Sequence, residues 1–156
     1  MNCEKTKKLI SCVNNFCEKK NHFLTKYVSP ILLLTLRLMI AGVFFRSGLT
    51  KISNFDSTIF LFENEYNVPL ISPLVAAYCA TFFELACSVL LTIGLATRLA
   101  TLPLIGMALV IQFTIMENVM HLYWLAILAT ILTFGAGCIS LDALIKKCAQ
   151  KCTNKK

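Results

Sequence analysis

The stretch LTLRLMIAGVFFRSGLTK, residues 34–51, decides the fold. It is largely apolar, yet it carries Arg37, which lies near the middle of the longer apolar run that contains it. The apolar run around it covers residues 28–48, and a helix of that length crosses about 30 Å of hydrocarbon at ~1.5 Å per residue. The stretch therefore predicts a membrane-spanning helix with a buried charge that needs a partner.

Composition extends this prediction to the whole chain. Of its 156 residues, 57% are hydrophobic and 15% are charged, which is too apolar for an ordinary soluble domain. Three more apolar runs follow, and the last of them has no polar face to present to water. The predicted fold class is all-α: a four-transmembrane-helix bundle over residues 28–141. Its expected spans are residues 28–48, 73–96, 99–116 and 122–141.

Basic residues flank this predicted membrane domain. Six precede the first span, one lies between the second and third spans, and five follow the fourth. The positive-inside rule then places both termini in the cytoplasm. The net charge of +7 indicates contact with anionic lipid, because no motif of interleaved basic and aromatic residues suggests nucleic-acid binding.

The two terminal segments are expected to lie outside the bilayer. Residues 1–27 carry apolar side chains at helical spacing among lysines, which favours an amphipathic helix on the cytoplasmic surface. Residues 142–156 form a basic tail, either as a shorter amphipathic helix or as a disordered segment. A disordered basic tail is the alternative for the N-terminal segment as well.

A polar seam is predicted between the first two spans. Glu84 is the only charge in its run, and it lies at a depth similar to that of Arg37, so the sequence predicts that the two pair. Gly48 and Lys51 share the helix face of Arg37, while Ser88 shares that of Glu84. These residues are expected to line a cavity that opens outward.

Three more polar residues fall near the outer ends of the third and fourth spans: Gln112, Glu117 and His121. Glu117 and His121 are one helical turn apart if the third span continues that far. They form either a proton-exchanging pair near a ligand headgroup or an ordinary polar turn. Both interpretations stay open.

Neither a metal nor an intrinsic cofactor is predicted. The eight cysteines include no C-x-x-C pair, and the two histidines are not placed to hold a haem between spans. The cytoplasmic cysteines Cys12, Cys17, Cys148 and Cys152 have spacings that are not typical of a zinc site.

Three segments together resemble the DoxX family. RLMIAGVFFRSGLTKI resembles the first-span signature of the family, with Arg37, Gly48 and Lys51 at its spacing. ELACSVLLTIGLATRLATLPL is similar to the second-span segment, and GAGCISLDALI resembles the family's Gly-x-Gly-x-x-Ser-Leu-Asp ending. The resemblance covers roughly residues 31–147.

The resemblance implies a four-helix protein of the bacterial cytoplasmic (inner) membrane that is linked to a redox complex. Without its own redox group, the chain would bind a quinone or act beside a redox protein partner, as a subunit and not as a complete enzyme. The alternative is a non-catalytic membrane scaffold or small-solute carrier, in which the Arg37/Glu84 pair is a structural lock. Expected partners are the lipid bilayer and either a redox protein or a second copy of the chain.

Overall fold

The computed structural model describes residues 24–66, 71–114 and 119–153, and these residues form helices and no strand. The all-α class is therefore confirmed. The amphipathic helix expected over residues 1–27 lies almost wholly outside the described residues. Only its last part is seen, in the π-helical turn η1 (Leu24–Val28).

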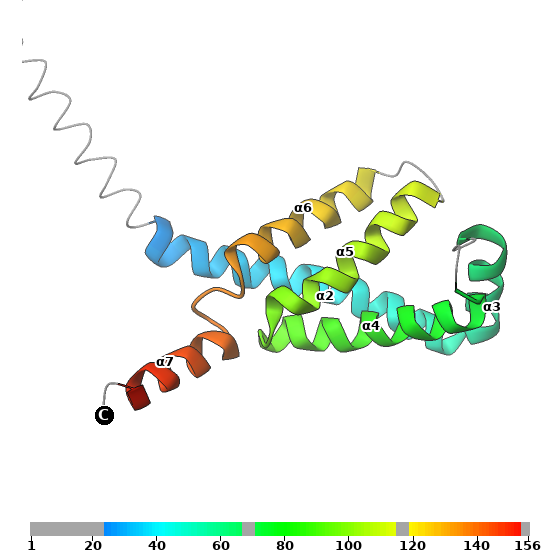
Figure 1. Cartoon of the computed structure of the whole chain (residues 1–156). Coiled ribbons are helices and arrows are strands. Elements are labelled where there is room, and N and C mark those ends of the chain that lie inside the picture. The colour runs from blue at the N-terminus through cyan, green and yellow to red at the C-terminus, as the bar shows by residue number, and fades with distance from the viewer. Residues whose placement is uncertain (1–23, 67–70, 115–118, 154–156) are drawn as a thin grey trace, which may run out of the picture.

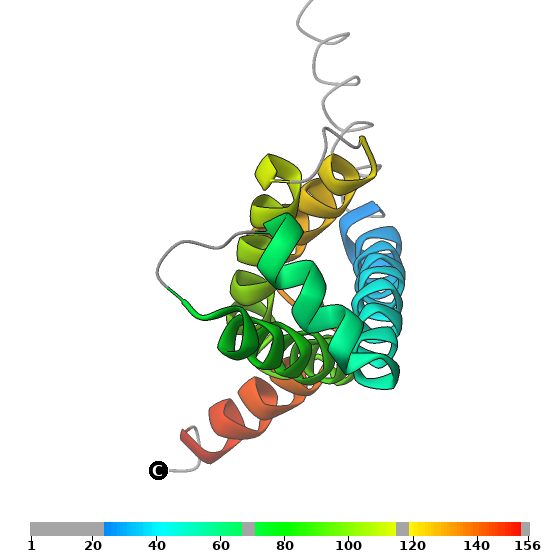
Figure 2. The ribbon, with the colours of Figure 1, turned by 90° about the vertical axis from the view of Figure 1, so that its right-hand side faces the viewer.

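Four helices form an elongated bundle (Figures 1 and 2). Helix α2 packs mainly against α4, and α5 packs mainly against α6. Short helical segments lie at one end of the bundle, the α3 end, and α7 leaves from the opposite end, the α7 end. The bundle helices are α2 (Ser29–Ser53), α4 (Pro73–Ile93), α5 (Thr97–Thr114) and α6 (Val119–Phe134). The end segments are α3 (Phe55–Leu61), η2 (Phe62–Tyr66) and α7 (Leu141–Thr153).

Two helical stretches among the described residues are long and apolar enough to cross a membrane. They are the continuous stretch Leu24–Ser53 and α4, whereas α5 and α6 are shorter apolar helices. Two helix ends differ clearly from the ends of the expected spans. Helix α2 continues to Ser53 instead of ending at residue 48. Helix α6 ends at Phe134 instead of residue 141, because Gly135 and Gly137 adopt φ values of +78° and +76°, outside the helical region.

The surface of the bundle carries many large apolar side chains. Large apolar side chains such as Leu99, Phe113 and Phe134 are 70%, 85% and 70% exposed. The core between the four helices holds aliphatic and aromatic side chains, and Phe44 packs against Trp124 with ring centroids 6.0 Å apart. An apolar surface of this extent is suited to contact with lipid.

The basic C-terminal segment is a helix. Ser140 caps it, because the Ser140 Oγ accepts a hydrogen bond from the Ala143 N–H at 3.2 Å. Of the two alternatives for this segment, the structure therefore shows the helix, α7, whose residues beyond Ala143 are exposed.

Candidate functional site

Arg37 is buried, with 2% of its surface exposed, but Glu84 is not its partner. Its guanidinium donates one hydrogen bond to the Ala136 carbonyl at 2.7 Å and another to the Ile139 carbonyl at 3.1 Å. Both carbonyls belong to the loop that joins α6 to α7. The predicted Arg37–Glu84 pair is therefore wrong, and so is the structural lock built on it.

The error comes from the depth assigned to each residue. Glu84 lies level with Gly48, since a Cβ at Gly48 would be 3.4 Å from the Glu84 Cβ. Arg37 precedes Gly48 by three turns of helix, which is roughly 16 Å along the axis. Arg37 therefore lies toward the α7 end of the bundle, out of reach of Glu84.

Gly94 makes room for the arginine. It ends α4 in the left-handed conformation with φ of +73°, and a Cβ there would lie 2.7 Å from the Arg37 Nη1. Because α4 ends at this glycine, Arg98 belongs to the next helix, α5. Arg98 is exposed and donates to the Thr133 carbonyl at 3.0 Å.

Asp142 links α7 to the start of α5 at the same end of the bundle. Its Oδ1 accepts a hydrogen bond from the Ala96 N–H at 2.9 Å and its Oδ2 accepts one from the Thr97 N–H at 3.2 Å, so it caps α5 from α7. Burial alone would raise the pKa of Asp142, but these backbone hydrogen bonds and nearby Lys146 outweigh burial and lower it. The carboxylate is thus ionised at neutral pH. We call Arg37, Gly94, Ala136, Ile139 and Asp142 the Arg37 cluster.

Glu84 pairs with Lys51 instead. The Lys51 Nζ lies 2.9 Å from both Glu84 Oε1 and Oε2, and it also donates to the Ser47 Oγ at 2.8 Å. The side chains of Lys51 and Glu84 are 15% and 3% exposed. Ser47, Lys51 and Glu84 form what we call the Lys51 cluster.

A close approach of α2 to α4 allows this pairing. A Cβ at Gly48 would meet the Leu85 side chain at 2.8 Å, so a larger residue would push the two helices apart. Ser88 does not reach the ion pair, because its hydroxyl donates to the Glu84 backbone carbonyl one turn earlier. The structure thus brings Gly48, Lys51 and Glu84 together and leaves Ser88 as a buried helix residue.

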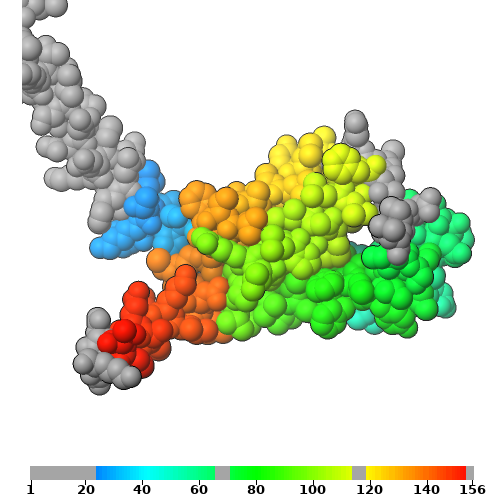
Figure 3. Space-filling model, viewed as in Figure 1, coloured from blue at the N-terminus to red at the C-terminus, as the bar shows by residue number. Residues whose placement is uncertain are grey.

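A cavity of about 310 Å³ lies beside the Lys51 cluster. It opens between α4 and α5, which diverge from their connecting turn toward the α3 end (Figures 1 and 3). The expected cavity between the first two spans is therefore misplaced by one helix. Its lining is Lys51, Phe62, Ile71, Ala76, Cys79, Ala80, Phe83, Glu84, Pro103, Gly106, Met107, Val110 and Ile111.

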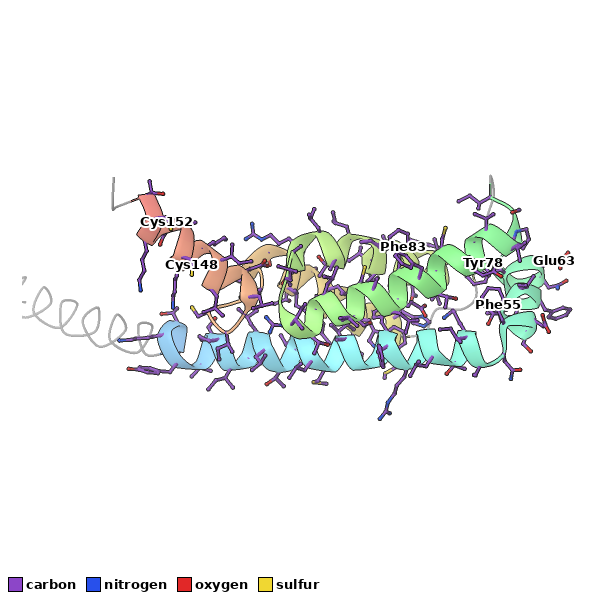
Figure 4. The ribbon with its side chains drawn as sticks, turned by 90° about the horizontal axis from the view of Figure 1, so that it is seen from below. Phe55, Glu63, Tyr78, Phe83, Cys148 and Cys152 are labelled. Atoms are coloured by element: carbon purple, nitrogen blue, oxygen red, sulfur yellow. The ribbon has the colours of Figure 1, made fainter. Side chains whose placement is uncertain are left out.

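Residues of the α3 end lie beside this cavity, and Phe62 on η2 is part of its lining. Phe62 packs with Ala76 and Ala77, and Phe55 on α3 packs against Tyr78 on α4 with ring centroids 4.5 Å apart (Figure 4). The cavity is therefore lined by apolar side chains, except for Lys51 and Glu84 of the Lys51 cluster, which are charged.

Gln112 and His121 are not among the described residues that line this cavity. Gln112 on α5 and His121 on α6 are partly buried, and the Gln112 Oε1 and His121 Nδ1 have no hydrogen-bond partner among the described residues. The His121 ring packs edge-on against Trp124 at 4.9 Å. Glu117 lies outside the described residues, so its expected pairing with His121 stays a prediction.

A protein-family model for DoxX matches residues 32–117 of the chain. The chain belongs to the DoxX family. No curated protein matches the chain, and no solved structure matches it. The DoxX match includes the Lys51 cluster and all the described residues that line the cavity, and it ends before the loop that binds Arg37.

Ser47, Pro103 and Gly106 are among the contributors to these sites that were not singled out from the sequence of this DoxX protein. Ser47 could have been found from its position one helical turn before Lys51 on the buried side. Pro103 and Gly106 carried a signal too, because proline and glycine within an apolar helix often mark a surface of close approach or a cavity.

The cysteines in the described part of the DoxX chain are free thiols, and they form no disulfide there. Cys79, Cys87, Cys138, Cys148 and Cys152 are free. Cys148 and Cys152 are exposed on α7 (Figure 4), while the Cys12 and Cys17 of the considered zinc site lie outside the described residues.

Proposed function

We propose that this DoxX protein is a quinone-linked accessory component of a membrane redox complex. Its α4–α5 cavity binds the ring of a lipid-soluble quinone or of the corresponding quinol. The observation that carries the proposal is a buried ion pair, Lys51–Glu84, at the wall of an otherwise apolar cavity between two lipid-facing helices.

The cavity fits such a ligand in size and in chemistry. Its volume of about 310 Å³ is near the lower end of small-molecule sites, which range from about 300 to 1,000 Å³. Phe62 and Phe83 offer aromatic surface to a ring, and the Lys51 cluster offers polar groups to its oxygen atoms. An apolar tail would leave between α4 and α5 into the bilayer.

The protein acts as a subunit in this proposal. Its sequence has no C-x-x-C pair and only two histidines, so we assign electron transfer to a redox protein partner and ligand binding to this chain. A non-catalytic scaffold is the second candidate. It is favoured by the Arg37 cluster, in which both charged side chains bind backbone groups.

Filling the cavity is expected to weaken ligand binding. Gly106 lines the cavity and a Cβ there meets nothing within 4 Å, so Gly106→Leu occupies ligand space without a clash. We expect binding of a short-chain benzoquinone/benzoquinol mixture to weaken about tenfold or more. The measurement is calorimetric titration of the full chain in lipid nanodiscs.

Gly42 provides the matched control, because it is an exposed helical glycine with equal free space that does not line the cavity. Gly42→Leu should bind as the unmodified protein does. Equal binding by both variants would place the ligand elsewhere, and no binding by the unmodified protein would favour the scaffold.

We also propose that α5 and α6 cross the bilayer, which gives four spans with both termini in the cytoplasm of a bacterium. The two helices contain no charge other than Arg98 at the start of α5, and they pack along the long helices α2 and α4. Their lengths of roughly 27 and 24 Å suit a bilayer that thins slightly around them. Charge supports this orientation: exposed Asp56, Glu63 and Glu65 lie at the α3 end, and the α7 end carries lysines.

Labelling is expected to distinguish the two ends. In a variant with all eight cysteines replaced, a new cysteine at Asn64 should react with a membrane-impermeant maleimide added outside intact cells. A new cysteine at Gln150 on α7 should react only after the membrane is opened. Both native positions are exposed, so accessibility within the protein is matched. The reverse pattern would contradict the orientation.

A further inference from the structure

The donors and acceptors of the Lys51 cluster are not equally used. An ammonium has three N–H donors, and Lys51 makes three hydrogen bonds, one to Ser47 and two to Glu84. No donor of Lys51 is left over by this count.

Glu84, in contrast, keeps spare capacity. A carboxylate offers about four lone-pair positions. Lys51 occupies two of them, and the Ser47 hydroxyl also interacts with this carboxyl group. At least one acceptor position therefore remains on a group that lines the cavity.

The other described lining residues offer no strong side-chain donor to match this free acceptor position. Apart from Lys51 and Glu84, the described lining residues are apolar, and the Cys79 thiol is only a weak donor. Pro103 also lacks a backbone N–H. A carbonyl oxygen buried here would face an acceptor without a donor, which is unfavourable in an apolar surrounding.

We propose that the cavity prefers the hydroxyl-bearing quinol to the corresponding quinone, with Glu84 accepting the hydrogen bond from the quinol hydroxyl. This inference rests on the proposed function and adds to it the redox form of the ligand. Ser47 sets the preference, because it occupies the Lys51 donor that would otherwise bind a quinone carbonyl.

The test compares three ligands with one ring, titrated anaerobically into the full chain in nanodiscs: a short-chain benzoquinol, its benzoquinone and its bis-methyl ether. A hydrogen bond to a charged group predicts that the quinol binds roughly tenfold or more tightly than the other two. Equal or tighter binding of the quinone would overturn the inference and leave the proposed function standing. Failure of all three ligands to bind would overturn the proposed function itself.

Ser47→Ala is the diagnostic variant, since it frees one Lys51 donor while keeping the ion pair. We expect the preference for quinol to shrink severalfold, mainly because the quinone binds more tightly. Ser53→Ala is the matched control, because the Ser53 hydroxyl is exposed at the end of the same helix and donates to the Thr50 carbonyl. An unchanged preference in Ser47→Ala would contradict the role of Ser47.

Discussion

Replacing Glu84 by leucine is expected to lower the free energy of unfolding by about 3–5 kcal/mol, because it leaves the Lys51 ammonium without its counter-charge between α2 and α4. Lys51→Met should be costly for the matching reason. The double variant should lose less than the sum of the two, since its remaining side chains are apolar. Unfolding in detergent micelles with increasing fractions of a denaturing detergent measures all four proteins.

The control is a second cycle that joins Glu84→Leu with Arg37→Leu. These two side chains have different partners and lie three helical turns apart in depth, so their effects should add within about 0.5 kcal/mol. Strong coupling in this cycle, or none between Lys51 and Glu84, would contradict the observed pairing.

Arg37→Leu is expected to have the second-largest effect, about 3 kcal/mol. It removes the buried hydrogen bond to the Ala136 carbonyl and the partly buried one to the Ile139 carbonyl, and a buried carbonyl left without a partner costs about 1–3 kcal/mol. Arg37→Lys should recover part of the loss, because an ammonium keeps the charge but lacks the two-pronged guanidinium. The same unfolding assay measures both variants.

Arg46 supplies the control for this series, because it lies on the same helix and is exposed. Arg46→Leu should change the free energy of unfolding by no more than about 0.5 kcal/mol. An Arg37→Leu protein as stable as the Arg46→Leu protein would mean that the loop between α6 and α7 does not depend on the arginine.

Helical periodicity identified the buried face of α2 correctly. Arg37, Ala41, Phe44 and Gly48 are all buried, and Lys51 is nearly so, as expected from their spacing. The apolar runs also located every bundle helix. Such features follow from the order of residues along one helix, which a sequence displays directly.

The partner of each charge could not be found in this way. Pairing depends on how far one helix is shifted along another, and a sequence does not display that shift. The glycines that end α6 early were visible in the sequence. Their consequence, two carbonyls turned toward Arg37, depends on the path of the loop.

The position of the cavity could not be predicted from the sequence either. Its position between α4 and α5 depends on the angle at which these helices diverge from Gly94, and the apolar lining residues resemble any other lipid-facing surface. Gln112 and His121 are candidate site residues by sequence because they are polar, yet neither is among the described residues that line the cavity.

The hydrogen bonds of Arg37 also order events during synthesis. The arginine enters the chain 99 and 102 residues before the two carbonyls that it binds. At roughly 5–20 residues per second, a ribosome needs about 5–20 s to make that interval. During that interval, while α4, α5 and α6 are made, the Arg37 guanidinium on α2 lacks its two native hydrogen-bond partners. The nascent bundle cannot close at its α7 end before Ile139 has been added.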